Sequence, residues 1–198
     1  PRFKDHGFIP VLRTEDDVDV LLAYPAPPGG SGSRVWLHVL LFVLTVLSTL
    51  WAGASQETGT FLGLEGFIEN WSLGLSFTIP LLTILGVHEF GHYFVARHYK
   101  LDVSLPYFIP FPLNPLVGTL GAVIRIQSPF ESKKALFDVG IAGPLAGLAV
   151  AIPVVAWGLV NAEIQRFAPG AGVTVFSEPI LFQWMAERIV GTREEGTD

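Results

Sequence analysis

The chain has 198 residues, of which 50% are hydrophobic and 15% are charged, whereas about 25% of the residues of an ordinary soluble domain are charged. The lack of cysteine excludes disulfide bonds and thiolate metal sites, and a net charge of −6 argues against a nucleic-acid-binding surface. With a mean hydropathy of +0.49, this composition predicts a membrane protein, in which any zinc would be held by nitrogen and oxygen atoms.

Residues 1–34 form a polar N-terminal segment, and residues 25–33 at its end have the proline, glycine and serine content of a flexible linker. Residues 35–198 are expected to form one membrane-embedded domain. The chain does not begin with methionine, and its start lacks the charged, apolar and small-residue order of a signal peptide. We therefore expect the sequence to begin inside a longer protein.

Three long apolar stretches predict transmembrane helices. Residues 35–54 carry no formal charge over 20 positions, and a helix of that length spans about 30 Å, the thickness of the hydrocarbon core of a bilayer. A second span is predicted at residues 72–97, with a bend at Pro80. The third covers residues 139–160, with Asp138 as a candidate N-cap. The alternative for the first stretch, a buried helix of a soluble core, is disfavoured by its length.

The connection between the second and third spans cannot be a regular helix throughout, because four prolines interrupt residues 106–115. Residues 116–126 are apolar but only 11 long, too short to cross a bilayer, and they include two glycines. They predict a re-entrant loop or hairpin packed against protein, since loop backbone facing lipid would leave its amides unpaired. Residues 180–190 form a short amphipathic piece that would lie at the interface or begin a further element. The predicted fold is an all-α multi-pass membrane protein with about three transmembrane helices plus a re-entrant loop or hairpin.

Lysine and arginine predict the orientation. Residues 97–137 hold five of them and the N-terminal 34 residues hold four, whereas residues 53–71 hold none and residues 161–178 hold one. Because Lys- and Arg-rich loops face the cytoplasm, the second span is expected to run inwards. Its polar His-Glu-Phe-Gly-His motif then lies towards the cytoplasmic side, most simply of a prokaryotic cytoplasmic membrane.

This motif, residues 88–92, carries the chemistry. Helical positions i and i+4 share one face, so His88 and His92 can present two imidazole nitrogens to one Zn²⁺ ion. Glu89 lies beside them, where it can act as the general base on a water molecule that zinc has made acidic. His-Glu-x-x-His is a zinc-protease signature. The alternative, polar packing without a metal, is disfavoured because each ionisable residue in a span costs about 2.5–3.5 kcal/mol on insertion scales.

Other polar and small residues in the spans have plainer interpretations. His38 stands alone in the first span, where a hydrogen bond to another helix is favoured over metal ligation. Gly140, Gly143 and Gly147 give the third span a small-residue face, which predicts close approach to another helix and could place that face near the motif.

Residues 88–92 and 137–147 resemble the site-2 protease family of intramembrane zinc metalloproteases. Residues 106–112 and 118–124 are similar to the branch related to the plant ethylene-dependent gravitropism-deficient and yellow-green proteins. The resemblance covers roughly residues 35–190. It implies an endopeptidase that hydrolyses peptide bonds in or near the transmembrane segments of membrane-tethered regulatory proteins, with single-pass membrane proteins as substrates and the lipid bilayer as surroundings. It also implies that the hairpin, similar to residues 113–127, receives a substrate strand by edge pairing.

One part of the family pattern is absent. The family takes its third zinc ligand from the Asp of a Leu-Asp-Gly motif preceded by Asn-x-x-Pro, and neither motif occurs in this chain. We therefore expect an Asp ligand beyond residue 198. The chain by itself is expected to bind zinc weakly and to hydrolyse nothing. Two alternatives follow: a zinc-binding membrane transporter or receptor without hydrolysis, which would not need Glu89 as a base, and an inactive scaffold that lacks the third ligand.

Overall fold

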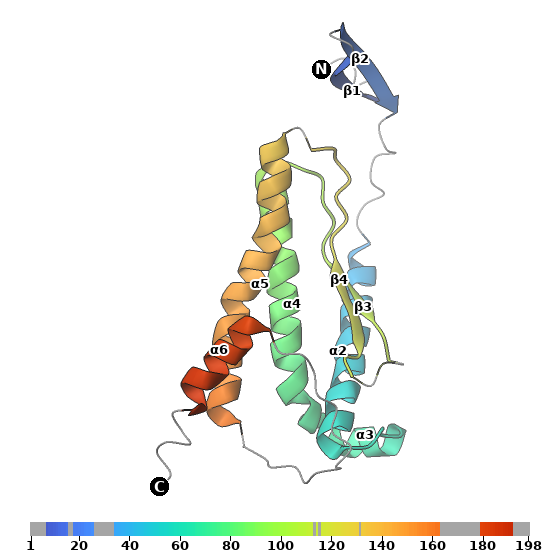
Figure 1. The fold of residues 1–198 in the computed structure, drawn as a ribbon. Coiled ribbons are helices and arrows are strands. Elements are labelled where there is room, and N and C mark those ends of the chain that lie inside the picture. Colours follow the sequence, from blue (N-terminus) through green and yellow to red (C-terminus); the bar gives the residue numbers. More distant parts are fainter. Residues whose placement is uncertain are drawn as a thin grey trace.

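The computed structural model describes residues 7–15, 18–25, 34–112, 114, 116–130, 132–162 and 179–191. The elements of this part of the chain are β1 (Phe8–Glu15), β2 (Val18–Pro25), α2 (Val35–Thr58), α3 (Leu64–Asn70), the 3-10 turn η1 (Trp71–Gly74), α4 (Leu75–His98), β3 (Tyr107–Pro110), β4 (Thr119–Val123), α5 (Lys133–Asn161) and α6 (Ile180–Ile189) (Figure 1).

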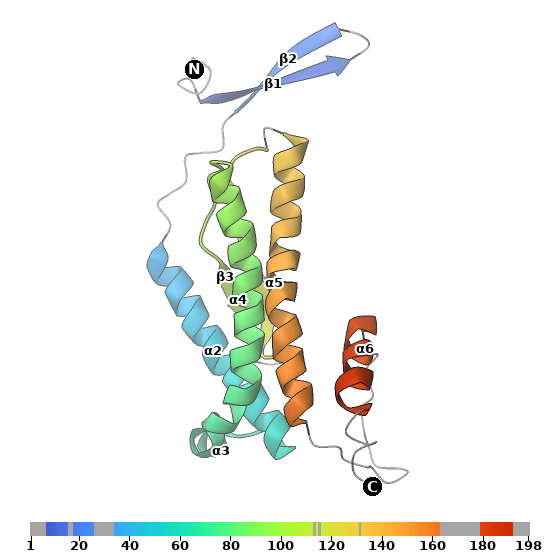
Figure 2. The ribbon, with the colours of Figure 1, turned by 90° about the vertical axis from the view of Figure 1, so that its left-hand side faces the viewer.

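The structure is mostly helical, and three of its helical segments are long and apolar enough to cross a membrane, as predicted. They are Val35–Thr58, Leu64–His98 and Lys133–Asn161. In both views α4 lies between α2 and α5 (Figures 1 and 2). α4 continues as a helix through Pro80, and the bend expected there stays a prediction. The amphipathic piece at residues 180–190 forms the short helix α6, which contacts α5 and buries Met185.

α5 begins earlier than the apolar stretch indicated, because a polar side chain caps it ahead of that stretch. The Ser132 hydroxyl accepts a hydrogen bond from the Ala135 amide, so the helix starts at Lys133. Asp138, predicted as the N-cap, therefore lies inside the helix, and the prediction was wrong. Its carboxylate instead accepts a hydrogen bond from the Tyr99 hydroxyl, which joins the end of α4 to α5.

Small residues allow close approach between neighbouring helices. A Cβ on Gly91 of α4 would lie 2.7 Å from the Ala142 carbonyl oxygen of α5. A Cβ on Gly74, at the start of α4, would lie 2.2 Å from the Leu50 carbonyl oxygen of α2. Both distances are far below van der Waals contact, so only glycine fits at these crossings.

The connection between α4 and α5 forms an antiparallel β-hairpin, in which Tyr107 pairs with Val123. Its first strand lies in the proline-flanked segment, so the hairpin starts earlier than the 113–127 range indicated. Its position as a re-entrant element in a bilayer stays a prediction. The strands continue as an irregular ladder to the bridge between Val103 and Ile126. There they pack on a buried cluster that includes Ala96 of α4 and Val139 of α5.

Two contacts attach this hairpin to α2. His38 Nδ1 lies 3.1 Å from the Pro106 carbonyl oxygen, to which it donates a hydrogen bond, and its ring lies against Tyr107 with 4.0 Å between centroids. The preference for a hydrogen bond over metal ligation at His38 agrees with this contact, although the partner is backbone rather than another helix. In the hairpin turn Gly118 has φ +72°, and a Cβ there would lie 2.4 Å from the Ser48 carbonyl oxygen.

The N-terminal segment contains a second hairpin that the sequence analysis did not predict. β1 and β2 pair antiparallel from Phe8 with Pro25 to Glu15 with Val18. Residues 26–33, most of the predicted linker, lie outside the described residues. The division of the chain at residue 34 stays a prediction.

The close crossing at Gly74 predicts a large effect of one methyl group. Gly74→Ala should lower the free energy of unfolding by about 1–3 kcal/mol, because the added Cβ forces the backbones of α2 and α4 apart. Gly63→Ala is the matched control, since Gly63 also caps a helix N-terminus and a Cβ there meets nothing within 4 Å. Circular dichroism during SDS titration of the protein in mild detergent measures both. Equal stability of the two variants would contradict the packing described.

The contact between Tyr99 and Asp138 predicts a pH effect. Tyr99 follows the last residue of α4, and its hydrogen bond to the Asp138 carboxylate raises the pKa of its hydroxyl above the ordinary value. Its stabilising effect should therefore be complete below about pH 10, the unfolded pKa, and be lost as the pH rises through the folded pKa. In a titration followed by phenolate absorbance, the step removed by Tyr99→Phe should lie above that of an ordinary tyrosine. A step at the ordinary position would rule out the hydrogen bond.

Candidate functional site

His88, Glu89 and His92 all lie on α4, in its C-terminal half. The two histidines are one turn apart and turn the same ring nitrogen inwards: their Nε2 atoms are 3.2 Å apart. The ring centroids are 4.8 Å apart, and the ring planes cross at 75°. The two imidazoles therefore converge on one point beside α4, as the i, i+4 spacing requires.

This spacing suits a shared metal ion. Two imidazole nitrogens at the zinc–nitrogen distance of about 2.0–2.1 Å and a tetrahedral angle would be about 3.3 Å apart. The observed 3.2 Å is close to that value, so two side chains of one helix already have the separation that a shared ion requires. In the part of the chain that the structure describes, no group of three or more His, Cys, Asp or Glu side chains could hold a metal. The site residues and the Asp ligand expected beyond residue 198 thus stay predictions.

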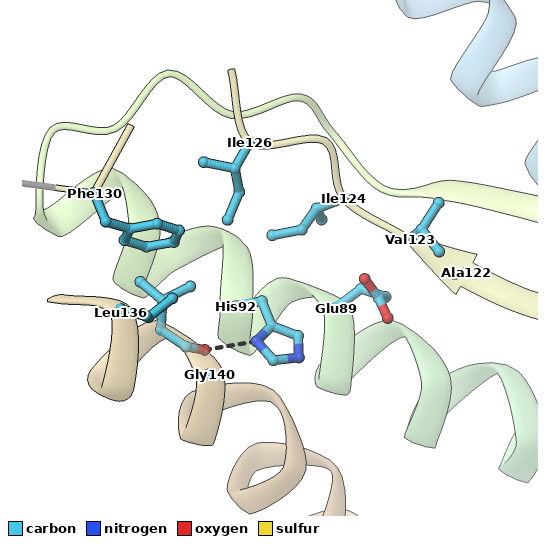
Figure 3. Close-up of a pocket in the computed structure, with 10 residues that line it drawn as sticks. Glu89, His92, Ala122, Val123, Ile124, Ile126, Phe130, Leu136 and Gly140 are labelled. Atoms are coloured by element: carbon cyan, nitrogen blue, oxygen red, sulfur yellow. Dashed lines mark hydrogen bonds between the residues drawn. The ribbon is translucent and has the colours of Figure 1, made fainter. Parts of the chain in front are cut away.

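The orientation of His92 is determined by α5. Its Nδ1 atom lies 2.6 Å from the Val139 carbonyl oxygen (Figure 3). A carbonyl can only accept, so Nδ1 carries the proton and, in the neutral ring, Nε2 keeps its lone pair. That lone pair faces His88. A hydrogen bond from the outer ring nitrogen to a backbone carbonyl is how metal-binding histidines are commonly held in the ligating tautomer.

The glycine face of α5 makes room for both imidazoles. A Cβ on Gly143 would lie 2.1 Å from His92 Nε2. A Cβ on Gly147 would lie 3.2 Å from Cβ and Nδ1 of His88. The prediction that this face approaches the motif helix closely is confirmed by these contacts.

Glu89 is buried and projects towards the β-hairpin. The backbone N–H of Ile124, just after β4, donates a hydrogen bond to its carboxylate. Glu89 and His92 also line a cavity of about 390 Å³ between α4, α5 and the segment after β4 that carries Ile124 and Ile126 (Figure 3). The carboxylate is thus held beside the two imidazoles and open to a space that a ligand could enter.

The sequence analysis did not find the backbone groups that hold these side chains. The Val139 carbonyl and the Ile124 amide belong to ordinary apolar residues, so neither has a compositional signal. Gly143 did have one, as a member of a glycine row, but the sequence could not identify His92 as the side chain that its missing Cβ accommodates.

The chain is similar to known zinc metalloproteases. Residues 76–194 match the family described as peptidase family M50. The chain is 38% identical over 146 residues to the probable zinc metalloprotease EGY1, chloroplastic, of Arabidopsis thaliana, covering 64% of this chain and 26% of that protein. It is 30% identical over 195 residues to the probable zinc metalloprotease EGY2, chloroplastic, of the same plant, covering 92% of this chain and 33% of that protein.

A further relative is the probable zinc metalloprotease EGY1, chloroplastic, of Oryza sativa subsp. japonica, with 31% identity over 147 residues, covering 64% of this chain and 25% of that protein. The chain therefore spans about a quarter to a third of the length of these curated relatives. No solved structure matches it.

The packing of His92 on α5 predicts the metal affinity of two glycine variants. Gly143→Ala should weaken Zn²⁺ binding about 10- to 100-fold, the range found when groups that orient a ligand are changed, because its methyl group occupies the position of His92 Nε2. Gly140→Ala is the control on the same helix, where a Cβ meets nothing within 4 Å. Competition with a chelating dye measures both affinities. Equal affinities would show that α5 does not position the ligand.

Proposed function

The chain belongs to peptidase family M50, and from that premise we propose that it is the zinc-binding part of an endopeptidase that cleaves peptide bonds at membrane depth. The observation that carries the proposal is the convergence of His88 and His92, with Nε2 atoms 3.2 Å apart, beside the buried carboxylate of Glu89. Zn²⁺ as the ion is supported by this donor set and by the names of the curated relatives.

The residues would divide the work as follows. His88 and His92 hold Zn²⁺, and the Val139 carbonyl keeps His92 in the tautomer that ligates. When bound, zinc supplies Lewis acidity, which polarises the scissile carbonyl and makes water acidic enough to lose a proton near neutral pH. Glu89 accepts that proton and later delivers it to the leaving amine. The Ile124 amide holds the carboxylate in position for both transfers.

A peptide substrate in extended form has a place to pair. Arg125 exchanges hydrogen bonds with Ser104, from its amide to the hydroxyl at 2.9 Å and from the Ser104 amide to its carbonyl at 2.9 Å. Successive residues of a strand direct their backbone groups to opposite edges. In the bridge between Val103 and Ile126, the hydrogen bonds are made by the flanking residues, so the backbone groups of Ile126 point to the other edge. The Ile124 amide faces Glu89 on that side, and a substrate strand would add there by edge pairing. Edge pairing supports a substrate that is extended near the cleaved bond. Because the site lies on a membrane-spanning helix, we propose membrane-tethered, single-pass proteins as the substrates.

The surroundings of the site are part of the proposal as well. Three helices able to span a membrane support an integral membrane protein, and the Lys and Arg distribution supports an orientation with the C-terminal end of α4 towards the cytoplasm. The prokaryotic cytoplasmic membrane stays a prediction, because the curated relatives carry chloroplastic names.

The role of Glu89 is tested by removing its basicity while keeping its shape. In the full-length protein reconstituted in liposomes, Glu89→Gln should lower cleavage of a membrane-tethered test substrate about 10²- to 10⁴-fold, the usual contribution of a general base. Zinc content, measured by plasma mass spectrometry, should change little. His88→Ala is the contrasting variant, which should lose the metal as well as the activity.

Two results would contradict the proposal. Undiminished cleavage by Glu89→Gln would exclude the general-base mechanism. Stoichiometric zinc in the wild type without cleavage of any membrane-tethered substrate would favour the transporter or receptor interpretation instead.

A further inference from the structure

The cavity next to Glu89 is lined mainly by apolar side chains, which zinc binding and proton transfer do not require. Among the described residues that line it, only Glu89 and His92 have polar side chains. The remaining wall is hydrocarbon contributed by three separate segments of the chain. An apolar cavity next to a hydrolytic centre would favour substrates that place an apolar side chain in it.

The walls are side chains in a fixed arrangement. Ile124 and Ile126 lie two apart in the segment that follows β4, and both line the cavity. Leu136, Val139 and Gly140 share a face of α5 at helical spacing. Val139 belongs to a buried cluster, against which Ile124, Ile126 and Phe130 pack. The floor of the cavity is therefore part of this packed cluster.

The open side of the cavity is apolar too. Leu136 is 54% exposed and Val123 is 50% exposed, so a ligand that covers them would remove hydrocarbon from its surroundings. Figure 3 shows Phe130 and Leu136 at one end and Glu89 at the other, with His92 between them. An occupant that fills the apolar end would hold its adjoining backbone beside His92 and Glu89.

The space is of a size that one large side chain would fill. At about 390 Å³ it is near the lower end of the roughly 300–1,000 Å³ range of pockets that take small organic ligands. One large side chain with its backbone suits that volume, whereas a complete helix does not. The backbone edge proposed for substrate pairing runs along the same wall, so a strand paired there would direct alternate side chains towards it.

We propose that this cavity is the specificity site of the peptidase, and that it receives a bulky apolar side chain, leucine or phenylalanine in kind, of a substrate residue adjoining the cleaved bond. The inference rests on the proposed function and extends it to the class of sequence that is cut. A charged or amide side chain there would lose its water without gaining partners. A small one would leave the cavity unfilled.

Gly140 offers a direct test, because it lines the cavity and a Cβ there meets nothing within 4 Å. Gly140→Leu should occupy part of the cavity, since its Cβ has open space around it. Gly158→Leu is the matched control: it is the same change on the same helix, also with open space around Cβ, at a residue that does not line the cavity. The substrates are a membrane-tethered test protein with a mapped cleavage site and variants of it with Ala, Leu, Phe or Asp on either side of the bond.

Wild type and Gly158→Leu should cleave the Leu and Phe substrates with at least a tenfold higher kcat/KM than the Ala substrate at one of the two positions, since one methylene group in an apolar pocket is worth about 10- to 200-fold. The Asp substrate should be cut least. Gly140→Leu should lose this preference, so that its kcat/KM values for the Ala, Leu and Phe substrates lie within a few-fold of one another. Binding of the same substrates to Glu89→Gln protein, measured by fluorescence anisotropy, should follow the same order.

Each contrary outcome has a separate meaning. Cleavage by the wild type without a side-chain preference at either position, or an unchanged preference in Gly140→Leu, would overturn the specificity site while the peptidase function stands. No cleavage of any substrate by the wild type would overturn the proposed function and this inference together. If Gly140→Leu cuts nothing, Ile126→Ala decides, since an enlarged cavity should shift the preference from Leu towards Phe and an unshifted one overturns the proposal.

Discussion

The close contact between α4 and α5 is the constraint on which the candidate site depends. α5 approaches α4 so nearly that Gly91 and Gly143 have no room for a methyl group. The same approach brings the Val139 carbonyl within 2.6 Å of His92 Nδ1. In a bilayer such contact cannot rely on the hydrophobic effect between helices, because lipid is as apolar as the side chains, so van der Waals packing and backbone hydrogen bonds carry it. The contact that packs α5 on α4 therefore also orients the imidazole of His92.

The hairpin between these helices places irregular backbone among apolar helices, which requires its polar groups to be paired. Some pair within the ladder, others with side chains: the Ser104 hydroxyl accepts from the Arg125 amide, and the Asp102 amide donates to Ser128. The backbone at Ile124 is turned towards Glu89 instead. The solution that satisfies the backbone also positions the buried carboxylate, so Glu89 and the strand support one another.

The spanning helices and the shared face of the two histidines could be predicted from the sequence, because they depend on composition over many residues or on fixed spacing. A run of about 20 uncharged residues leaves few alternatives to a spanning helix, and positions i and i+4 must share a face. The sequence did not predict where an element begins when a single side-chain or backbone contact determines it. The Ser132 cap started α5 ahead of its apolar stretch and left Asp138 in mid-helix. The first strand of the hairpin formed in a segment where proline only excluded a helix. β1 and β2 formed in a segment whose overall polarity concealed two short runs of apolar residues. The groups that hold His92 and Glu89 are main-chain atoms, which have no sequence signature at all.

α2 contributes no side chain to the candidate site, yet it fixes the strand that borders it. His38 anchors the beginning of the hairpin and the backbone at Ser48 receives its turn, so the strand is clamped at both ends along one helix. Helix α2 therefore positions the hairpin, and through it the residues that border the site. Excision of α4 and α5 as a two-helix peptide would retain every motif residue and still lose the registration of Ile124 with Glu89, so the smallest fragment that preserves this architecture has to start at Val35.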